Sequence, residues 1–153
     1  MKQSNSKTYP EIRYLQNVII CPVNITEVTD KDGNISYNFS RIDLPDNAMN
    51  RQKTADQLMQ EATIQYLTVI KKQKLNEGFY VNETLFDSDT NARLAYAELR
   101  LKISRDPTYT VSWKASEGNW VTMDVALLDQ IESAGEEHIA NVFAWLQSEL
   151  NKL

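Results

Sequence analysis

The pattern of hydrophobic and polar positions near the N-terminus predicts a β-hairpin. An apolar run over 18–23 passes into period-two alternation on both sides of a polar turn, at Val23, Ile25, Ile35, Tyr37 and Phe39. Asp32-Gly33 is a strong tight-turn signal between them, because glycine adopts a positive φ without steric cost. An isolated hairpin is only marginally stable in water, so we expect its apolar face to pack on a helix, on further strands or on a partner chain.

The first ten residues have no periodic apolar pattern and end in Pro10. Such a segment is typical of a flexible lead that acts, if at all, in docking. We therefore expect residues 1–49 to form an N-terminal hairpin arm or attachment module, and residues 50–153 to form a second domain.

After Pro45 the apolar spacing changes to three and four, which is typical of a helix. Asp46 or Asn47 can cap its start, and Gly78 is a natural C-terminal cap. A helix of this length, roughly 30 residues, spans about 45 Å and exceeds what a small domain needs. It either projects from the domain or contacts another copy.

The rest of the chain alternates between short strands and helices. Short strands are predicted at 79–81 and 84–86, then a helix that ends at Asp106-Pro107, and then a second hairpin from Tyr109 to Val121. Thr122 or Asp124 caps a final helix that runs to the end. The predicted fold class is α+β: an N-terminal β-hairpin arm followed by a compact three-helix unit with small antiparallel strands.

Composition and charge remove several function classes. The chain has 153 residues, 42% hydrophobic, and a net charge of −5, which disfavours binding to nucleic acid. We expect no metal or cofactor, because Cys21 and His138 are the only residues of their types. No segment is apolar enough for a signal peptide or a membrane span. Glycine-rich phosphate loops, Gly-x-Ser-x-Gly and His-Glu-x-x-His are all absent, so we expect no enzyme and no catalytic residue.

One segment resembles a calcium loop in its spacing. Oxygen-bearing side chains recur from Asp87 to Asn91, and Glu98 stands at the twelfth position. Ala92 occupies the sixth position, where the loop needs glycine, and a strand precedes the segment in place of a helix. An acidic helix start explains these carboxylates better; a small metal-dependent enzyme that uses Asp87 to Glu98 is a third, weaker interpretation.

The candidate functional residues are apolar or aromatic and lie in the two hairpins. Tryptophan serves both cores and protein interfaces, and the register of the second hairpin depends on whether its loop holds two residues or four. We expect Cys21 to be buried and inert, His138 to be a surface residue, and Lys71, Lys72 and Lys74 to be solvated. The candidate interface residues are Val23, Ile25, Ile35, Tyr37, Phe39, Trp113 and Trp120.

Several sequence features from Arg51 onward occur in one order: the helix end at Leu75 to Phe79, the stretches 85–93 and 111–114, Gly118 to Met123, and His138 to Phe143. In these features the chain resembles a domain of unknown function found at the C-terminal end of many bacteriophage tail and tail-fibre-locus proteins. Val142 replaces a cysteine that is frequent in that family, and the last helical turns are less charged. The family offers no established active site.

The resemblance implies a setting and not a reaction. We therefore expect a non-enzymatic structural component of a phage tail, at the baseplate or at the tail-fibre attachment, which connects other tail proteins. It would be made in the host cytoplasm, become part of the virion and be present in several symmetric copies, with neither nucleic acid nor membrane as a partner. The alternative is a tail-fibre assembly chaperone that is not retained in the virion.

Overall fold

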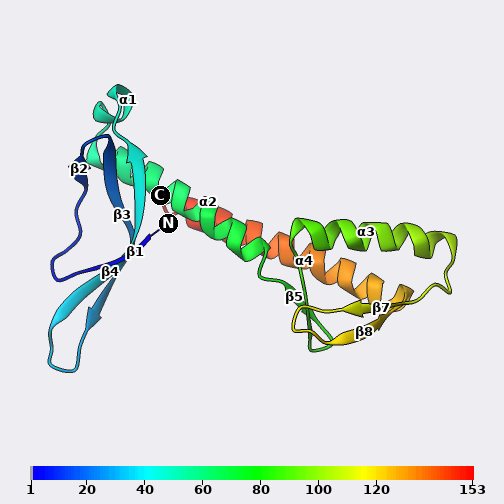
Figure 1. The fold of residues 1–153 in the computed structure, drawn as a ribbon. Helices are drawn as coiled ribbons and strands as arrows, with labels where there is room; N and C mark the ends of the chain where they lie inside the picture. Colours follow the sequence, from blue (N-terminus) through cyan, green and yellow to red (C-terminus); the bar gives the residue numbers. More distant parts are fainter. Residues whose placement is uncertain (1) are drawn as a thin grey trace. The chain divides into compact units, whose positions relative to one another are not determined.

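The computed structural model describes residues 2–153, which form eight β-strands and four α-helices (Figure 1). The chain divides into two compact units. The first, the sheet unit, extends to Ile70 and includes residues 150–153; the second, the helical unit, comprises residues 71–149. The division falls inside one helix, α2 (Ala55–Leu75), and not at the expected boundary between residues 49 and 50.

The sheet unit contains one antiparallel four-stranded sheet. Its strands are β1 (Lys2–Ser6), β2 (Arg13–Leu15), β3 (Val18–Thr29) and β4 (Ile35–Pro45), in the order β1-β4-β3-β2. The predicted hairpin is confirmed as β3 and β4. Its turn is held by the Asp30 carboxylate, which accepts hydrogen bonds from the backbone N–H groups of Asp32 and Asn34 at 2.9 and 2.8 Å. The side-chain amide of Asn34 also donates to this carboxylate, at 2.9 Å, and this bond, together with the backbone bonds, holds the pKa of Asp30 below its ordinary value.

The expectation of a flexible lead over residues 1–10 was wrong for most of that segment. Lys2–Ser6 is an edge strand that pairs with residues 37–41 of β4. Its side chains are polar and exposed or half-buried, so the sequence shows no apolar alternation that would predict a strand. Main-chain pairing and side-chain hydrogen bonds hold it in place, including Asn5 Nδ2 to Asn38 Oδ1 at 2.7 Å.

One face of the sheet carries the hydrophobic core of this unit. Ile19, Cys21 and Val23 alternate along β3, and Ile42 and Leu44 do so along β4. The sheet alone could not bury these side chains, because a single sheet leaves both its faces open to water. Leu58 and Ala62 of α2, both fully buried, belong to the same core and cover it.

Two helices replace the single long helix predicted after Pro45. A short helix, α1 (Ala48–Arg51), is capped by Asn47, whose Oδ1 accepts from the N–H of Asn50 at 2.9 Å. The chain then breaks, and α2 begins at a reciprocal cap: the Thr54 hydroxyl accepts from the N–H of Gln57, and the Gln57 side chain accepts from the N–H of Thr54. With 21 residues, α2 is about 32 Å long, not the predicted 45 Å.

Within the helical unit, the chain reverses direction at Gly78, after the end of α2. Gly78 has φ +83°, and its N–H donates to the Ser88 hydroxyl at 2.9 Å. The same hydroxyl donates to the carbonyl of Leu75 at 2.6 Å, so one buried serine ties the end of α2 to the segment before α3 (Thr90–Arg105). The predicted cap at Gly78 is confirmed, and the glycine is required there.

Two short hairpins and two helices complete this unit (Figure 1). Hairpin β5 (Phe79–Val81) and β6 (Thr84–Phe86) turns through two residues at positive φ, and hairpin β7 (Val111–Lys114) and β8 (Trp120–Met123) precedes α4 (Val125–Leu150). Asp89 caps α3, and Asp124 caps α4. The core residues come from both helices, from β5, β6 and β8, and from the loop after β7: Phe79, Val81, Phe86, Tyr96, Leu99, Ile103, Ala115, Met123, Leu128 and Ile131.

The architecture is therefore mixed α and β, with strands at the N-terminus, as predicted in outline. The described residues contain four helices and not three, because α1 is separate from α2. No helix within residues 2–153 combines the length and apolar character of a membrane span.

We expect Gly78→Ala to destabilise the protein more than Gly33→Ala. Both glycines adopt the left-handed conformation, with φ near +83° and +81°, so alanine costs about 1–2 kcal/mol at either position. Only at Gly78 would the new Cβ meet a fixed obstacle, the carbonyl oxygen of Phe86 at 2.6 Å, whereas at Gly33 nothing lies within 4 Å. Urea unfolding of the two variants measures the difference; equal losses would contradict the close approach.

We expect the Cys21 thiol to resist alkylation in the native protein. Burial, together with the nearby carboxylates of Glu61 and Asp43, raises the pKa of Cys21 from 9.0 to about 11. At neutral pH only about one thiol in ten thousand is then ionised, and the thiolate is the reactive form. Iodoacetamide labelling followed by mass spectrometry should show slow modification in buffer and rapid modification in denaturant. Rapid labelling in buffer would contradict the burial.

Candidate interaction surfaces

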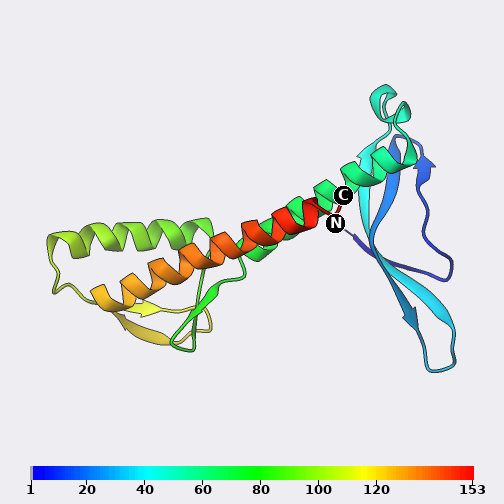
Figure 2. The same cartoon turned by 180° about the vertical axis from the view of Figure 1, so that it is seen from behind.

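The closed end of the β3–β4 hairpin extends past its neighbours in the sheet. β1 pairs only with residues 37–41, and β2 pairs only with residues 18–20. Val28 and Thr29 therefore pair with Ser36 and Ile35 alone, with no third strand beside them (Figure 2). This end of the hairpin is a two-stranded ribbon, a form that is marginal in water without further packing.

The sheet face opposite the core carries a stripe of three predicted interface residues, Ile35, Tyr37 and Phe39, which we call the outer stripe. Strand alternation places them on one face of β4, away from Ile42 and Leu44. Ile35 is 48% exposed, and Tyr37 and Phe39 are half-buried. The segment between β1 and β2 covers the stripe in part, because the Tyr9 ring lies 5.4 Å from that of Tyr37.

The other two predicted hairpin residues lie elsewhere. Val23 is 2% exposed and belongs to the core beneath α2, so it offers no surface. Ile25 is half-buried at an irregularity between Val23 and Thr26, where the pairing register shifts. Asn24, at φ +51°, makes that shift possible, since asparagine tolerates the left-handed conformation better than most residues. The period-two pattern could not reveal this break.

The two tryptophans of the second hairpin lie on opposite faces of it. Trp113 pairs with Val121, and Trp120 pairs with Lys114, so the loop holds five residues, a length that the sequence analysis did not consider. Trp113 packs on the core, with its ring 5.3 Å from that of Tyr96. Trp120 is 67% exposed. Of the two, only Trp120 is available as an interface residue.

The acidic segment at the start of α3 makes structural contacts. Asp89 caps the helix by accepting from the N–H of Ala92 at 2.8 Å, and Asp87 accepts from the Ser116 hydroxyl at 2.8 Å. Within the part of the chain that the structure describes, no group of three or more histidine, cysteine, aspartate or glutamate side chains is placed to hold a metal ion.

His138 and two of the lysines have aromatic neighbours. The His138 ring lies 6.1 Å from that of Phe79, and its Nε2 atom is buried without a hydrogen-bond partner among the described residues. Histidine was expected at the surface; it is half-buried. The ammonium groups of Lys71 and Lys74 lie over the rings of Phe143 and Trp145, at 5.8 and 5.0 Å, which is cation–π geometry.

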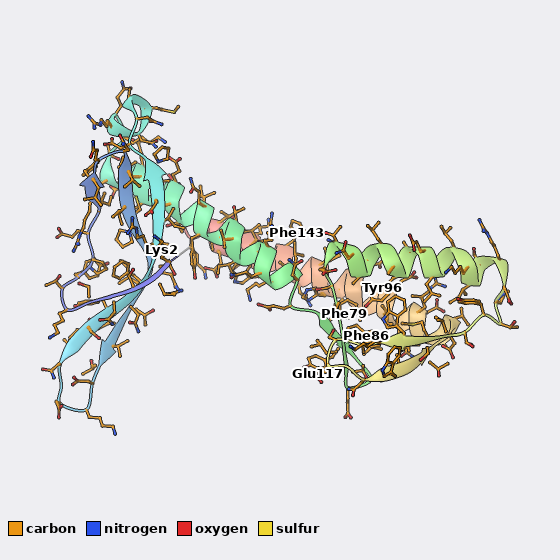
Figure 3. The ribbon with its side chains drawn as sticks, in the orientation of Figure 1. Lys2, Phe79, Phe86, Tyr96, Glu117 and Phe143 are labelled. Atoms are coloured by element: carbon orange, nitrogen blue, oxygen red, sulfur yellow. The ribbon has the colours of Figure 1, made fainter. Side chains whose placement is uncertain are left out.

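A cavity in the helical unit was missed by the sequence analysis. It has a volume of about 280 Å³ and lies between α3 and α4, with Phe79 of β5 in its lining. The side chains of Phe79, Phe86 and Tyr96 gather in the space beside these helices (Figure 3). The full lining is Phe79, Ser88, Arg93, Tyr96, Ala97, Ile131, Glu132, Gly135, Glu136 and Ile139.

Comparison with protein families gives one match, which covers more than half of the chain. Residues 58–150 match the family described as Domain of unknown function (DUF4376). The chain therefore belongs to this family. No curated protein and no solved structure matches it closely enough for comparison. The match confirms the predicted resemblance to a domain of unknown function and leaves its association with phage tails as a proposal.

We expect Trp113→Ala and Trp120→Ala to differ in stability. Removing Trp113 takes away core packing and the contact with Tyr96, at a cost of about 2–3 kcal/mol, since the side chain is half-buried. Removing the exposed Trp120 should change the free energy of unfolding by less than about 0.5 kcal/mol. Urea unfolding monitored by circular dichroism tests both; a large loss in the Trp120 variant would place that residue in the core.

Proposed function

We propose that this protein is a structural component of a bacteriophage tail, at the baseplate or the fibre attachment, that connects other tail proteins through its N-terminal hairpin. The observation that carries the proposal is the unpartnered closed end of the β3–β4 hairpin with its exposed Ile35. The phage setting rests on the resemblance of residues 51–153 to domains of tail and tail-fibre-locus proteins.

The hairpin supports a connecting role because of where its apolar side chains lie. Ile35 and Tyr37 are adjacent on one face, and Val28, 39% exposed, lies on the other, since it pairs with Ser36. The face with Ile35 and Tyr37 gains free energy when a partner removes it from water, about 25 cal/mol for each Å² buried. The open edges of β3 and β4 at this end also leave main-chain groups free to pair with a partner strand.

Tail assemblies are symmetric, so we propose that several copies of the protein occupy each particle. Its partners would be other tail, baseplate or fibre proteins. The connector requires no bound cofactor and no reaction. What it requires is that the outer stripe remain accessible until assembly.

Quantitative mass spectrometry of purified particles tests the structural role. A fixed ratio of this chain to the major tail proteins is the expected result. Absence from particles combined with abundance in infected-cell lysate would contradict it and would favour the assembly chaperone, which binds fibre chains and then leaves.

We expect Ile35→Glu to reduce incorporation into particles about tenfold or more, because a buried aliphatic side chain contributes about 1.5–3 kcal/mol and a charge in its place adds a desolvation cost. Val28→Glu is the matched control on the opposite face, with similar exposure and the same chemical change. Each variant is introduced into the phage genome, and particle occupancy is measured by mass spectrometry. Normal incorporation of the Ile35 variant would show that the outer stripe is not the contact.

A further inference from the structure

We propose that the cavity between α3 and α4 is a receptor for one aromatic side chain of a partner polypeptide, flanked in that partner by an acidic and a basic residue. This proposal extends the proposed function. It rests on the proposed function in one respect: the partner is assumed to be a protein. The whole cavity lies within the helical unit, separate in sequence from the hairpin.

Two small residues create the cavity. Ala97 lines it from α3 and Gly135 lines it from α4, so at these two positions neither helix supplies a side chain large enough to fill the space. Gly135 is a poor choice inside a helix by its conformational preference. A Cβ at this position would lie 3.4 Å from the Phe79 ring and would occupy the cavity's wall. Glycine thus keeps the space open at a position where the helix itself would favour alanine.

The size and lining fit one aromatic side chain. At about 280 Å³ the cavity is below the range of roughly 300–1,000 Å³ that is typical of sites for drug-sized ligands and cofactors. Apolar groups dominate its walls, with Ile131 and Ile139 on α4 and the rings of Phe79 and Tyr96 opposite. Aromatic rings prefer edge-to-face neighbours, so these two rings favour an aromatic ligand. Binding energy at protein interfaces concentrates in such anchor residues.

The charged residues beside the cavity indicate which residues should flank the aromatic side chain of the partner. Glu132 is already neutralised, since both its carboxylate oxygens accept from Arg100, at 3.0 and 2.6 Å. Arg93 and Glu136 are both exposed. Neither side chain forms an ion pair within residues 2–153. The guanidinium of Arg93 makes one hydrogen bond, to the Thr90 hydroxyl at 3.5 Å. A cation on α3 and a carboxylate on α4 thus stand unpaired on opposite walls. A polypeptide that carries an acid and a base around its anchor complements both, whereas a small apolar molecule complements neither.

The test is a titration of the full ¹⁵N-labelled chain with blocked pentapeptides, followed by backbone amide shifts. The probe is acetyl-Gly-Glu-Phe-Lys-Gly-amide; its matched controls replace Phe by Ser or Glu by Lys. We expect saturable shifts confined to Phe79 and to residues 88–97 and 131–139 at low millimolar concentration. Compared with the probe peptide, the Ser peptide should bind at least about tenfold more weakly. The Lys peptide should bind about two- to fivefold more weakly than the probe.

Variants of the protein separate the cavity from its surroundings. Ala97→Phe places a ring in the cavity from an exposed position and should abolish binding, whereas Ala140→Phe, exposed on α4 outside the lining, should not. Arg93→Gln should remove the preference for the Glu peptide over the Lys peptide, and Arg105→Gln on the same helix should preserve it. Thermal unfolding of each variant shows whether it is folded.

Three results would overturn the proposal: no shifts in these segments, equal binding of the Phe and Ser peptides, or free 3-phenylpropionate binding as tightly as the Phe peptide. The last result would make the cavity a small-molecule site. These three results say nothing about incorporation into particles through Ile35. Conversely, normal incorporation of the Ile35 variant would not affect the peptide titration. The two proposals can therefore fail independently.

Discussion

At Gly78 the backbone turns back on itself within contact distance of the Phe86 carbonyl, and the helical unit depends on this reversal. The Ser88 hydroxyl receives the N–H of Gly78 and donates to Leu75, so the three segments around it cannot separate without leaving buried polar groups unpaired. The turn also sends Phe79 into the core, where it forms part of the cavity wall. The position of one side chain in the candidate receptor is therefore set by a backbone conformation that only glycine adopts easily.

The sequence predicted those elements whose signals are local. Asp32-Gly33 identified the hairpin, and Asn47 and the acidic segment from Asp87 identified two helix starts. The side chains of Asn47 and Asp89 satisfy backbone groups a few residues away, which makes such signals local. The reciprocal cap formed by Thr54 and Gln57 was equally local, and its pattern was readable in the sequence as the start of a separate helix. Recognising it would have corrected the predicted length of α2.

Features that depend on distant segments could not be predicted in this way. The strand Lys2–Ser6 has no apolar face, and it forms because its main chain pairs with the edge of β4. Leu58 and Ala62 of α2 cover the sheet, which only tertiary packing reveals. Of the predicted interface residues, Ile35, Tyr37 and Phe39 share a face as period-two alternation requires, whereas Val23 is buried on the other face. The cavity arises from Ala97 and Gly135, which lie far apart in sequence, and a glycine inside a helix does not by itself show which residues face it.

The polar character of β1 has a consequence for solubility. An open strand edge invites pairing with the edge of another molecule, and proteins commonly limit this by making edge strands short and charged or polar. β1 is five residues long, begins with a lysine, and otherwise contains glutamine, serine and asparagine. It leaves a second molecule little apolar area to bury, so continuous growth of sheets from this edge is disfavoured. The polar edge therefore protects the sheet unit against aggregation.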